Sequence, residues 1–148
     1  MPEKIASKDI VIFCIGNEKF ALTTDEVKSI EELQEIIPVP RAPAYIAGLI
    51  NLRGAVIPVM DVRKRLTSGD VQTGRDTVIL VVEHQDESIG LIVDRVESVD
   101  QVVFDVKPVP AEVAAGNVGR FYQSVLETAK DKITIINKDN LLSLEEPT

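Results

Sequence analysis

The sequence predicts an all-β protein, and three observations support that prediction. The chain of 148 residues holds 20 valines and 16 isoleucines, and these β-branched side chains suit a pleated, half-buried strand. No segment has an amphipathic pattern long enough for an ordinary helix of about 11 residues. Glycine, proline and short polar stretches recur between the apolar runs, as is typical of short strands joined by turns. About ten strands are expected, arranged as a pair of small barrels or a sandwich.

The first predicted element is a β-hairpin. Residues 9–15 are apolar on both alternating faces, which favours a buried strand. Residues 16–18 supply turn chemistry, and residues 19–22 form the return strand. Residues 23–26 read Thr-Thr-Asp-Glu, which favours one capped helical turn because a threonine hydroxyl accepts a backbone N–H. A further strand is expected over residues 27–30.

A proline-rich loop and a second hairpin follow. Three prolines lie within residues 37–44, and proline removes a backbone donor and restricts its predecessor, so this segment is expected to be extended. Two apolar runs, 47–52 and 55–60, flank Arg53-Gly54, where glycine permits the positive φ of a tight reversal. Pro58 lies inside the return strand, which is therefore expected to be an edge strand or to carry a bulge.

The middle of the chain contains the clearest break in composition. Asp61 is placed to cap a short turn that ends at Leu66. Residues 67–75 are polar and contain two glycines, so they are expected to be a linker. Beyond it, residues 77–83 and 88–94 are strand-like and enclose a polar turn.

The last elements are strands and a short helix. Spaced valines predict a strand over residues 96–103, and Pro108 ends it. Residues 121–126 and 132–136 form a final predicted strand pair. Asn137 is placed to cap a short helix that ends near residue 144.

Composition excludes several classes of partner. A net charge of −8, from 16 basic and 24 acidic residues, argues against nucleic acid and anionic membranes. No stretch approaches the ~18 consecutive apolar residues of a membrane span, and the N-terminus does not open like a signal peptide. A single cysteine, Cys14, allows no internal disulfide. We therefore expect a cytoplasmic protein without membrane insertion.

Residues for catalysis are not gathered in the sequence. The one histidine, His84, falls in a predicted exposed turn, and Cys14 falls in a buried strand. Asp61 and Asp94 each follow an apolar strand, but their spacing does not pair them. The expectation is no enzyme, no catalytic residue, no cofactor and no metal site. The alternative is a small-molecule-binding or hydrolytic β-barrel that uses Asp61 or Asp94.

From the residues alone, Arg53 has two interpretations. Arginines are mostly exposed, so a solvated side chain at a hairpin tip is the simpler one. The other is an anchor in a protein interface, because the planar guanidinium donates several hydrogen bonds and the stem is apolar.

Two motifs resemble those of one protein family. Residues 43–63 read Pro-Ala-Tyr-Ile-Ala-Gly-Leu-Ile-Asn-Leu-Arg-Gly-Ala-Val-Ile-Pro-Val-Met-Asp-Val-Arg, and residues 89–96 read Ile-Gly-Leu-Ile-Val-Asp-Arg-Val. In this order and at this separation they resemble CheW-type chemotaxis coupling proteins. The resemblance covers residues 9–144.

The resemblance implies two five-stranded, SH3-like barrels packed around a shared core, with short helical turns. Residues 9–148 would form one CheW-like domain with approximate subdomains 9–66 and 76–148, joined by the linker 67–75, after a flexible N-terminus 1–8. It also implies a non-enzymatic scaffold that couples the cytoplasmic tips of chemoreceptors (methyl-accepting chemotaxis proteins) to the regulatory domain of the histidine kinase CheA. The protein would be cytoplasmic and recruited to membrane receptor arrays. An adaptor of a non-flagellar pathway, for example pilus motility, is the alternative.

The resemblance assigns surfaces to particular residues. Arg53, Val27 and Ile57 would bind the receptor, and Val11, Thr24 and Val27 would bind the kinase. Two positions depart from the family pattern, because Ser29 stands where Glu is frequent and Ser124 where Gly is common.

Overall fold

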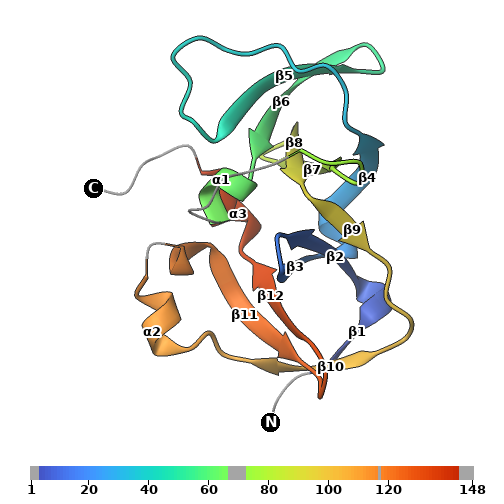
Figure 1. The fold of residues 1–148 in the computed structure, drawn as a ribbon, viewed down its shortest axis with the longest axis vertical. Helices are drawn as coiled ribbons and strands as arrows, with labels where there is room; N and C mark the ends of the chain where they lie inside the picture. Colours follow the sequence, from blue (N-terminus) through green and yellow to red (C-terminus); the bar gives the residue numbers. More distant parts are fainter. Residues whose placement is uncertain (1–3, 67–72, 117, 144–148) are drawn as a thin grey trace.

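The computed structural model describes residues 4–66, 73–116 and 118–143, and its strands form two sheets, which confirms the all-β prediction (Figure 1). The first sheet has seven strands, in the order β1 (Lys4–Ala6), β10 (Val103–Lys107), β11 (Tyr122–Glu127), β12 (Lys132–Ile136), β3 (Glu18–Thr23), β2 (Ile10–Ile15) and β9 (Arg95–Glu97). The second has five, in the order β4 (Val27–Glu32), β7 (Val78–His84), β8 (Glu87–Val93), β6 (Ala55–Asp61) and β5 (Ile46–Leu52).

Short helical segments connect the strands. The α-helical ones are α1 (Arg63–Leu66), α2 (Ala111–Ala114) and α3 (Lys138–Leu142), and the 3-10 turns are η1 (Ser7–Asp9), η2 (Thr24–Glu26) and η3 (Gly119–Phe121). The predicted cap of α3 is confirmed, since the Asn137 side chain accepts a hydrogen bond from the Asn140 amide. At η2 the Glu26 carboxylate accepts hydrogen bonds from both the backbone amide and the side-chain hydroxyl of Thr23. None of the helices in the described ranges has the length and apolar character that a membrane crossing requires.

The chain enters the second sheet once and then returns to the first. It leaves the first sheet after β3, builds β4 to β8 in the second sheet and comes back with β9. Two parallel pairings, β12 with β3 and β6 with β8, join strands that are distant in sequence. The predicted division into 9–66 and 76–148 therefore does not coincide with the two sheets. Sequence patterning detects hairpins, whereas parallel pairing over a long crossover leaves no local signal.

The two sheets share one apolar core. Phe13, Phe20 and Leu22 of the first sheet lie in the same buried cluster as Leu80 and Leu91 of the second. Each fully buried side chain of this size contributes about 1.5–3 kcal/mol relative to an exposed one. A smaller cluster belongs to each sheet alone: Ile12, Phe104 and Leu126 lie in that of the first, and Ile50, Ile57 and Val59 in that of the second.

Three predicted elements differ in the structure. The N-terminus 1–8 was expected to be flexible, but Lys4–Ala6 forms β1 against β10, and the buried Ser7 hydroxyl donates to the Asp100 carbonyl. The single strand expected over 96–103 is two strands, because β9 pairs with β2 whereas β10 pairs with β1 and β11. β1 and β9, each of three residues, extend the first sheet beyond the five strands expected.

Pro58 lies in an interior strand, so the prediction of an edge strand or bulge there is wrong. It stands opposite Leu49 of β5, and the parallel pairing of β6 with β8 begins only at Val59, which lies opposite Gly90. The register shift falls instead in β5, between Ile46 and Gly48. Proline has no backbone N–H to donate. The pairing of β6 with β8 starts only at Val59, so the missing N–H of Pro58 does not interrupt it.

Gly48 is a point where the backbone of the proline-rich loop approaches β5. Its φ is 148°, and a Cβ there would collide with the Ile37 carbonyl. Ile37 is held in place by two hydrogen bonds of 2.8 Å with Leu49. We expect Gly48→Ala to lower the free energy of unfolding by about 2 kcal/mol, because the loop must move away from β5. Urea unfolding measures this loss, and Gly74→Ala is the control, since nothing lies within 4 Å of a Cβ at Gly74. Equal stability of the two variants would contradict the prediction.

Candidate protein-binding surface

The tip of the β5–β6 hairpin presents Arg53 on a defined turn. Leu52 pairs with Ala55, so Arg53 and Gly54 form a two-residue loop, and their φ values are 51° and 88°. Positive φ at both central residues is the type I′ arrangement that matches the twist of paired strands. The Asn51 side chain supports the turn, because its Oδ1 accepts a hydrogen bond from the Gly54 amide at 3.0 Å.

The Arg53 side chain extends towards β4. One of its terminal nitrogens lies 3.4 Å from both carboxylate oxygens of Glu31, and the Arg53 side chain keeps 75% of its surface exposed. The Glu31 side chain, in contrast, is only 15% exposed. The ion pair keeps the guanidinium beside β4, where other groups can reach it.

An apolar row lies on the outer face of the same hairpin. Ile37, Leu49 and Pro58 are opposite one another in register, so their side chains lie on one face. Ile37 is 60% exposed, and Val56, two residues before Pro58, is 65% exposed. Residue-by-residue patterning missed Ile37 because it is the first residue of the proline-rich loop 37–44, and its pairing with Leu49 is what places it here.

Ile57 faces away from this row. It is 5% exposed and belongs to the buried cluster of the second sheet with Ile50 and Val59. Its side chain therefore packs on the buried face of the hairpin and does not form part of the solvent-facing surface.

Of the other predicted residues, Val27 begins β4, Thr24 lies in η2 just before it, and Val11 lies in β2 opposite Leu22. Val11 and Val27 are both half-buried against the shared core. Thr24 is exposed, and its hydroxyl donates to the Lys8 carbonyl at 3.1 Å. The Val27 amide donates to the Thr24 carbonyl, so these two residues are adjacent.

β4 connects the region around Val27 with the region around Arg53. Glu31, the neighbour of Arg53, lies four residues after Val27 on the same strand. At about 3.3 Å per residue, the two positions are roughly 13 Å apart. Arg53 therefore lies beside one end of this short strand, and Thr24 and Val27 lie at its other end.

Both departures from the family pattern lie beside irregular pairing. The register of β4 with β7 shifts between Val27 and Ser29, and that of β11 with β12 shifts between Tyr122 and Ser124. Ser29 is half-buried opposite Val81, so it adds no charge to the surface near Val27.

The two aspartates of the alternative reading are tied to Arg63. Its Nε and Nη2 lie 2.8 and 2.9 Å from the Asp61 carboxylate, and its Nη1 lies 3.2 Å from Asp94. Asp94 also accepts the Gly16 amide at 2.6 Å. The spacing of Asp61 and Asp94 in the sequence does not pair them, and it is the parallel pairing of β6 with β8 that brings both to Arg63. Both carboxylates therefore use oxygens to accept hydrogen bonds from Arg63.

Arg65 is a second buried arginine of α1 that the sequence did not single out. Its guanidinium lies 3.9 Å from the centroid of the Tyr45 ring and 5.1 Å from that of Phe121. Its Nη1 donates to the Leu141 carbonyl at 2.5 Å. These contacts join the second sheet to segments next to β11 and β12.

His84 was expected to be solvated in a turn, but it is the last residue of β7, and its side chain is only 15% exposed. Its Nδ1 lies 3.5 Å from an Asp139 oxygen. Across the part of the chain that the structure describes, no cluster of three or more His, Cys, Asp or Glu residues could hold a metal ion.

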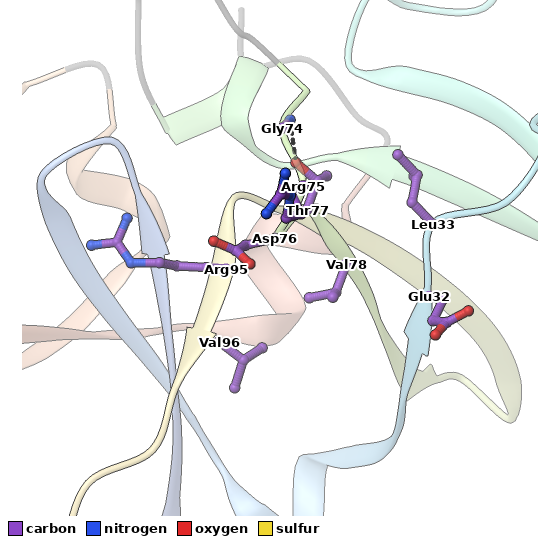
Figure 2. Close-up of a pocket in the computed structure, with 9 residues that line it drawn as sticks. All are labelled: Glu32, Leu33, Gly74, Arg75, Asp76, Thr77, Val78, Arg95 and Val96. Carbon is purple, nitrogen blue, oxygen red and sulfur yellow. Dashed lines mark hydrogen bonds between the residues drawn. The ribbon is translucent and has the colours of Figure 1, made fainter.

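Figure 2 shows a cleft where the edge strands of the two sheets meet, lined by Glu32 and Leu33 at the end of β4 and by Arg95 and Val96 in β9. Residues 74–78 form the rest of its wall, and a hydrogen bond of 2.9 Å from the Gly74 amide to the Thr77 hydroxyl closes that segment. Two arginines and two carboxylates line the cleft. Neither sign of charge dominates, so the cleft does not indicate an ionic ligand.

Cys14 is buried, as predicted, and its thiol donates to a Glu97 oxygen at 3.3 Å. Burial, and then the hydrogen bond to Glu97, raise the pKa of this thiol. The thiolate is the reactive form. We therefore expect Cys14 in the folded protein to react with a thiol-modifying reagent at pH 8 more slowly than in urea, by on the order of 100-fold. Absorbance assays of both samples test this, and equal rates would show that the thiol is accessible.

Comparison with known proteins identifies the relatives of this chain. The family model described as "CheW-like domain" matches residues 9–146. The chain is 31% identical to a chemotaxis protein CheW of Rhizobium meliloti over 94% of its own length and 90% of the relative's. It is 32% identical to one of Treponema pallidum, over 93% and 83% respectively. The crystal structure of the scaffolding protein TtCheW from Thermoanaerobacter tengcongensis is similar, with a TM-score of 0.79, 32% identity and coverage of 95% of this chain and 92% of that one.

Proposed function

The chain belongs to the CheW-like family and is an adaptor of chemotaxis signalling, and from this premise we propose that it holds chemoreceptor tips and the histidine kinase CheA on two neighbouring surfaces. The Arg53 end of β4 is the receptor surface. The Val11, Thr24 and Val27 end is the surface for the CheA regulatory domain. The adaptor acts in the cytoplasm and joins the receptor arrays through these contacts.

The observation that supports this proposal is the linkage of both ends by β4. Arg53 is exposed beside Glu31, next to the apolar row formed by Ile37, Leu49 and Pro58. An amphipathic helix suits such a surface, because it buries one apolar stripe and leaves its other face in water. Ile57 contributes by packing beneath the hairpin, and Val27 begins the strand that connects the two ends.

Signal transfer by this adaptor needs no chemistry of its own. The two carboxylates that could serve hydrolysis, Asp61 and Asp94, are held by Arg63. A rigid connector that binds two partners changes the arrangement of one when the other moves. We therefore propose that the protein has no catalytic activity.

Isothermal titration calorimetry with a purified receptor signalling fragment and with the CheA regulatory domain tests the proposal. We expect both to bind, with dissociation constants of about 1–10 μM, because exchangeable contacts of roughly 1,000–1,600 Å² are moderate in affinity. Absence of binding to both partners would overturn the proposed function.

Thr24→Lys separates the two surfaces. Thr24 is exposed at the predicted kinase end, so a larger charged side chain should weaken kinase binding about tenfold and leave receptor binding unchanged. Calorimetry with each partner measures both effects. Ser98→Lys, at an exposed position just beyond β9, is the control for added charge. Equal weakening of both partners would show that the surfaces are not separate.

A further inference from the structure

The shared core holds the two sheets together through apolar contacts, which are non-directional. Hydrogen bonds and stacked rings have preferred directions. A group that makes directional contacts with both sheets therefore adds a constraint on their relative angle.

Arg65 has this property. It is 8% exposed and projects from α1, directly after β6 of the second sheet. Its guanidinium is close to Tyr45, whose carbonyl accepts the Asp61 amide at the end of β6. Its other two contacts are Phe121, immediately before β11, and the carbonyl of Leu141 in α3, which follows β12.

The two segments that Arg65 touches, which adjoin strands of the first sheet, are themselves tied together. The Asn137 amide donates to the Phe121 carbonyl at 2.7 Å, and Asn137 caps α3. Arg120 also places its guanidinium 4.5 Å from the Phe121 ring centroid. Phe121 and Leu141 therefore form one firm support for the Arg65 side chain.

We infer that Arg65 is a positioning residue that fixes the angle between the hairpin bearing Arg53 and the first sheet bearing Val11, and that this angle is needed for the adaptor to control the kinase. The inference rests on the proposed function. A planar guanidinium stacks on rings and donates in fixed directions, whereas the lysine ammonium does neither. The two sheets of an Arg65→Lys variant should still pack but should rock against each other.

The test uses two separate single variants, Arg65→Lys and Tyr45→Leu. Tyr45→Leu removes one ring and leaves the hydrogen bond from Arg65 to the Leu141 carbonyl. Lys64→Met is the matched control, because Lys64 lies on the same helix and is exposed. Cysteines introduced at Glu83 and Lys107, exposed positions in the second and first sheets, carry spin labels. Pulsed electron resonance then measures the distribution of distances between the sheets.

Three readouts distinguish the outcomes. In both Arg65→Lys and Tyr45→Leu the distance distribution should broaden about twofold, and kinase activity in reconstituted receptor complexes should change about tenfold. Binding of each isolated partner should stay within about threefold of the wild type. Lys64→Met should match the wild type in every readout.

An unchanged distance distribution in a folded variant overturns the inference, as does normal kinase control with a broadened distribution. If Arg65→Lys does not fold, Tyr45→Leu decides by the same criteria. Failure of the wild-type protein to bind either partner counts against the proposed function. The distance measurement uses the adaptor alone, so its result does not depend on partner binding.

Discussion

Arg53→Ala is expected to weaken binding of the receptor signalling fragment by about 30-fold, which corresponds to about 2 kcal/mol of binding free energy. The guanidinium is exposed at the hairpin tip and borders the apolar row, so a helical partner can bury its stem and accept its hydrogen bonds. Its ion pair with Glu31 is long, at 3.4 Å, and leaves 75% of the Arg53 side chain exposed. Calorimetry with the receptor fragment measures the loss.

Two further variants separate the side chain from the backbone. Gln85 also has φ 51° at the first position of a two-residue hairpin loop, so Gln85→Ala reproduces the backbone effect without touching Arg53. Arg53→Asn removes the guanidinium but tolerates positive φ better than alanine. We expect Gln85→Ala to bind normally and Arg53→Asn to bind as weakly as Arg53→Ala. Full affinity in Arg53→Asn would assign the effect to the turn.

Arg63→Met is expected to lower the free energy of unfolding by about 3–5 kcal/mol, the largest loss of stability among the variants considered. Asp61 and Arg63 are 5% and 4% exposed, so the change leaves an unpaired carboxylate in the interior. Burial acts to lower the pKa of Arg63, but the contacts with Asp61 and Asp94 outweigh it and raise this pKa, which keeps the arginine charged. Urea unfolding at neutral pH measures the loss.

The cause of that loss can be isolated. Asp61→Asn combined with Arg63→Met removes the buried charge together with its partner, so it should recover part of the stability. Lys64→Met changes a neighbouring exposed side chain of the same helix and should be neutral. A double variant as unstable as Arg63→Met alone would mean that packing, and not the unpaired carboxylate, sets the cost.

These two variants act on different properties. Arg53 lies at a tip with few internal contacts, so its loss should affect binding and leave folding intact. Arg63 lies where the ends of β6 and β8 meet, and through Asp94 it reaches the turn between β2 and β3. Its loss should affect folding first and binding only through folding.

Local patterning predicted most of the strands and the hairpin tip. The hairpins around residues 16–18, 53–54 and 84–87 were predictable because apolar alternation and turn residues are short-range signals. The resemblance of residues 43–63 and 89–96 to one family then provided the function. β1 was missed because three residues carry too little pattern, and its partner strand begins about a hundred residues later.

The sequence by itself determined the all-β class, the family and the place of Arg53 on a tight turn, since each depends on residues close together in the chain. Only the tertiary structure decided that Ile57 is buried, that Asp61 and Asp94 share Arg63, and that Arg65 lies between Tyr45 and Phe121. These contacts arise from parallel pairing and from the packing of one sheet on the other. The separations that they span, such as 76 residues from Arg65 to Leu141, exceed the reach of any local signal.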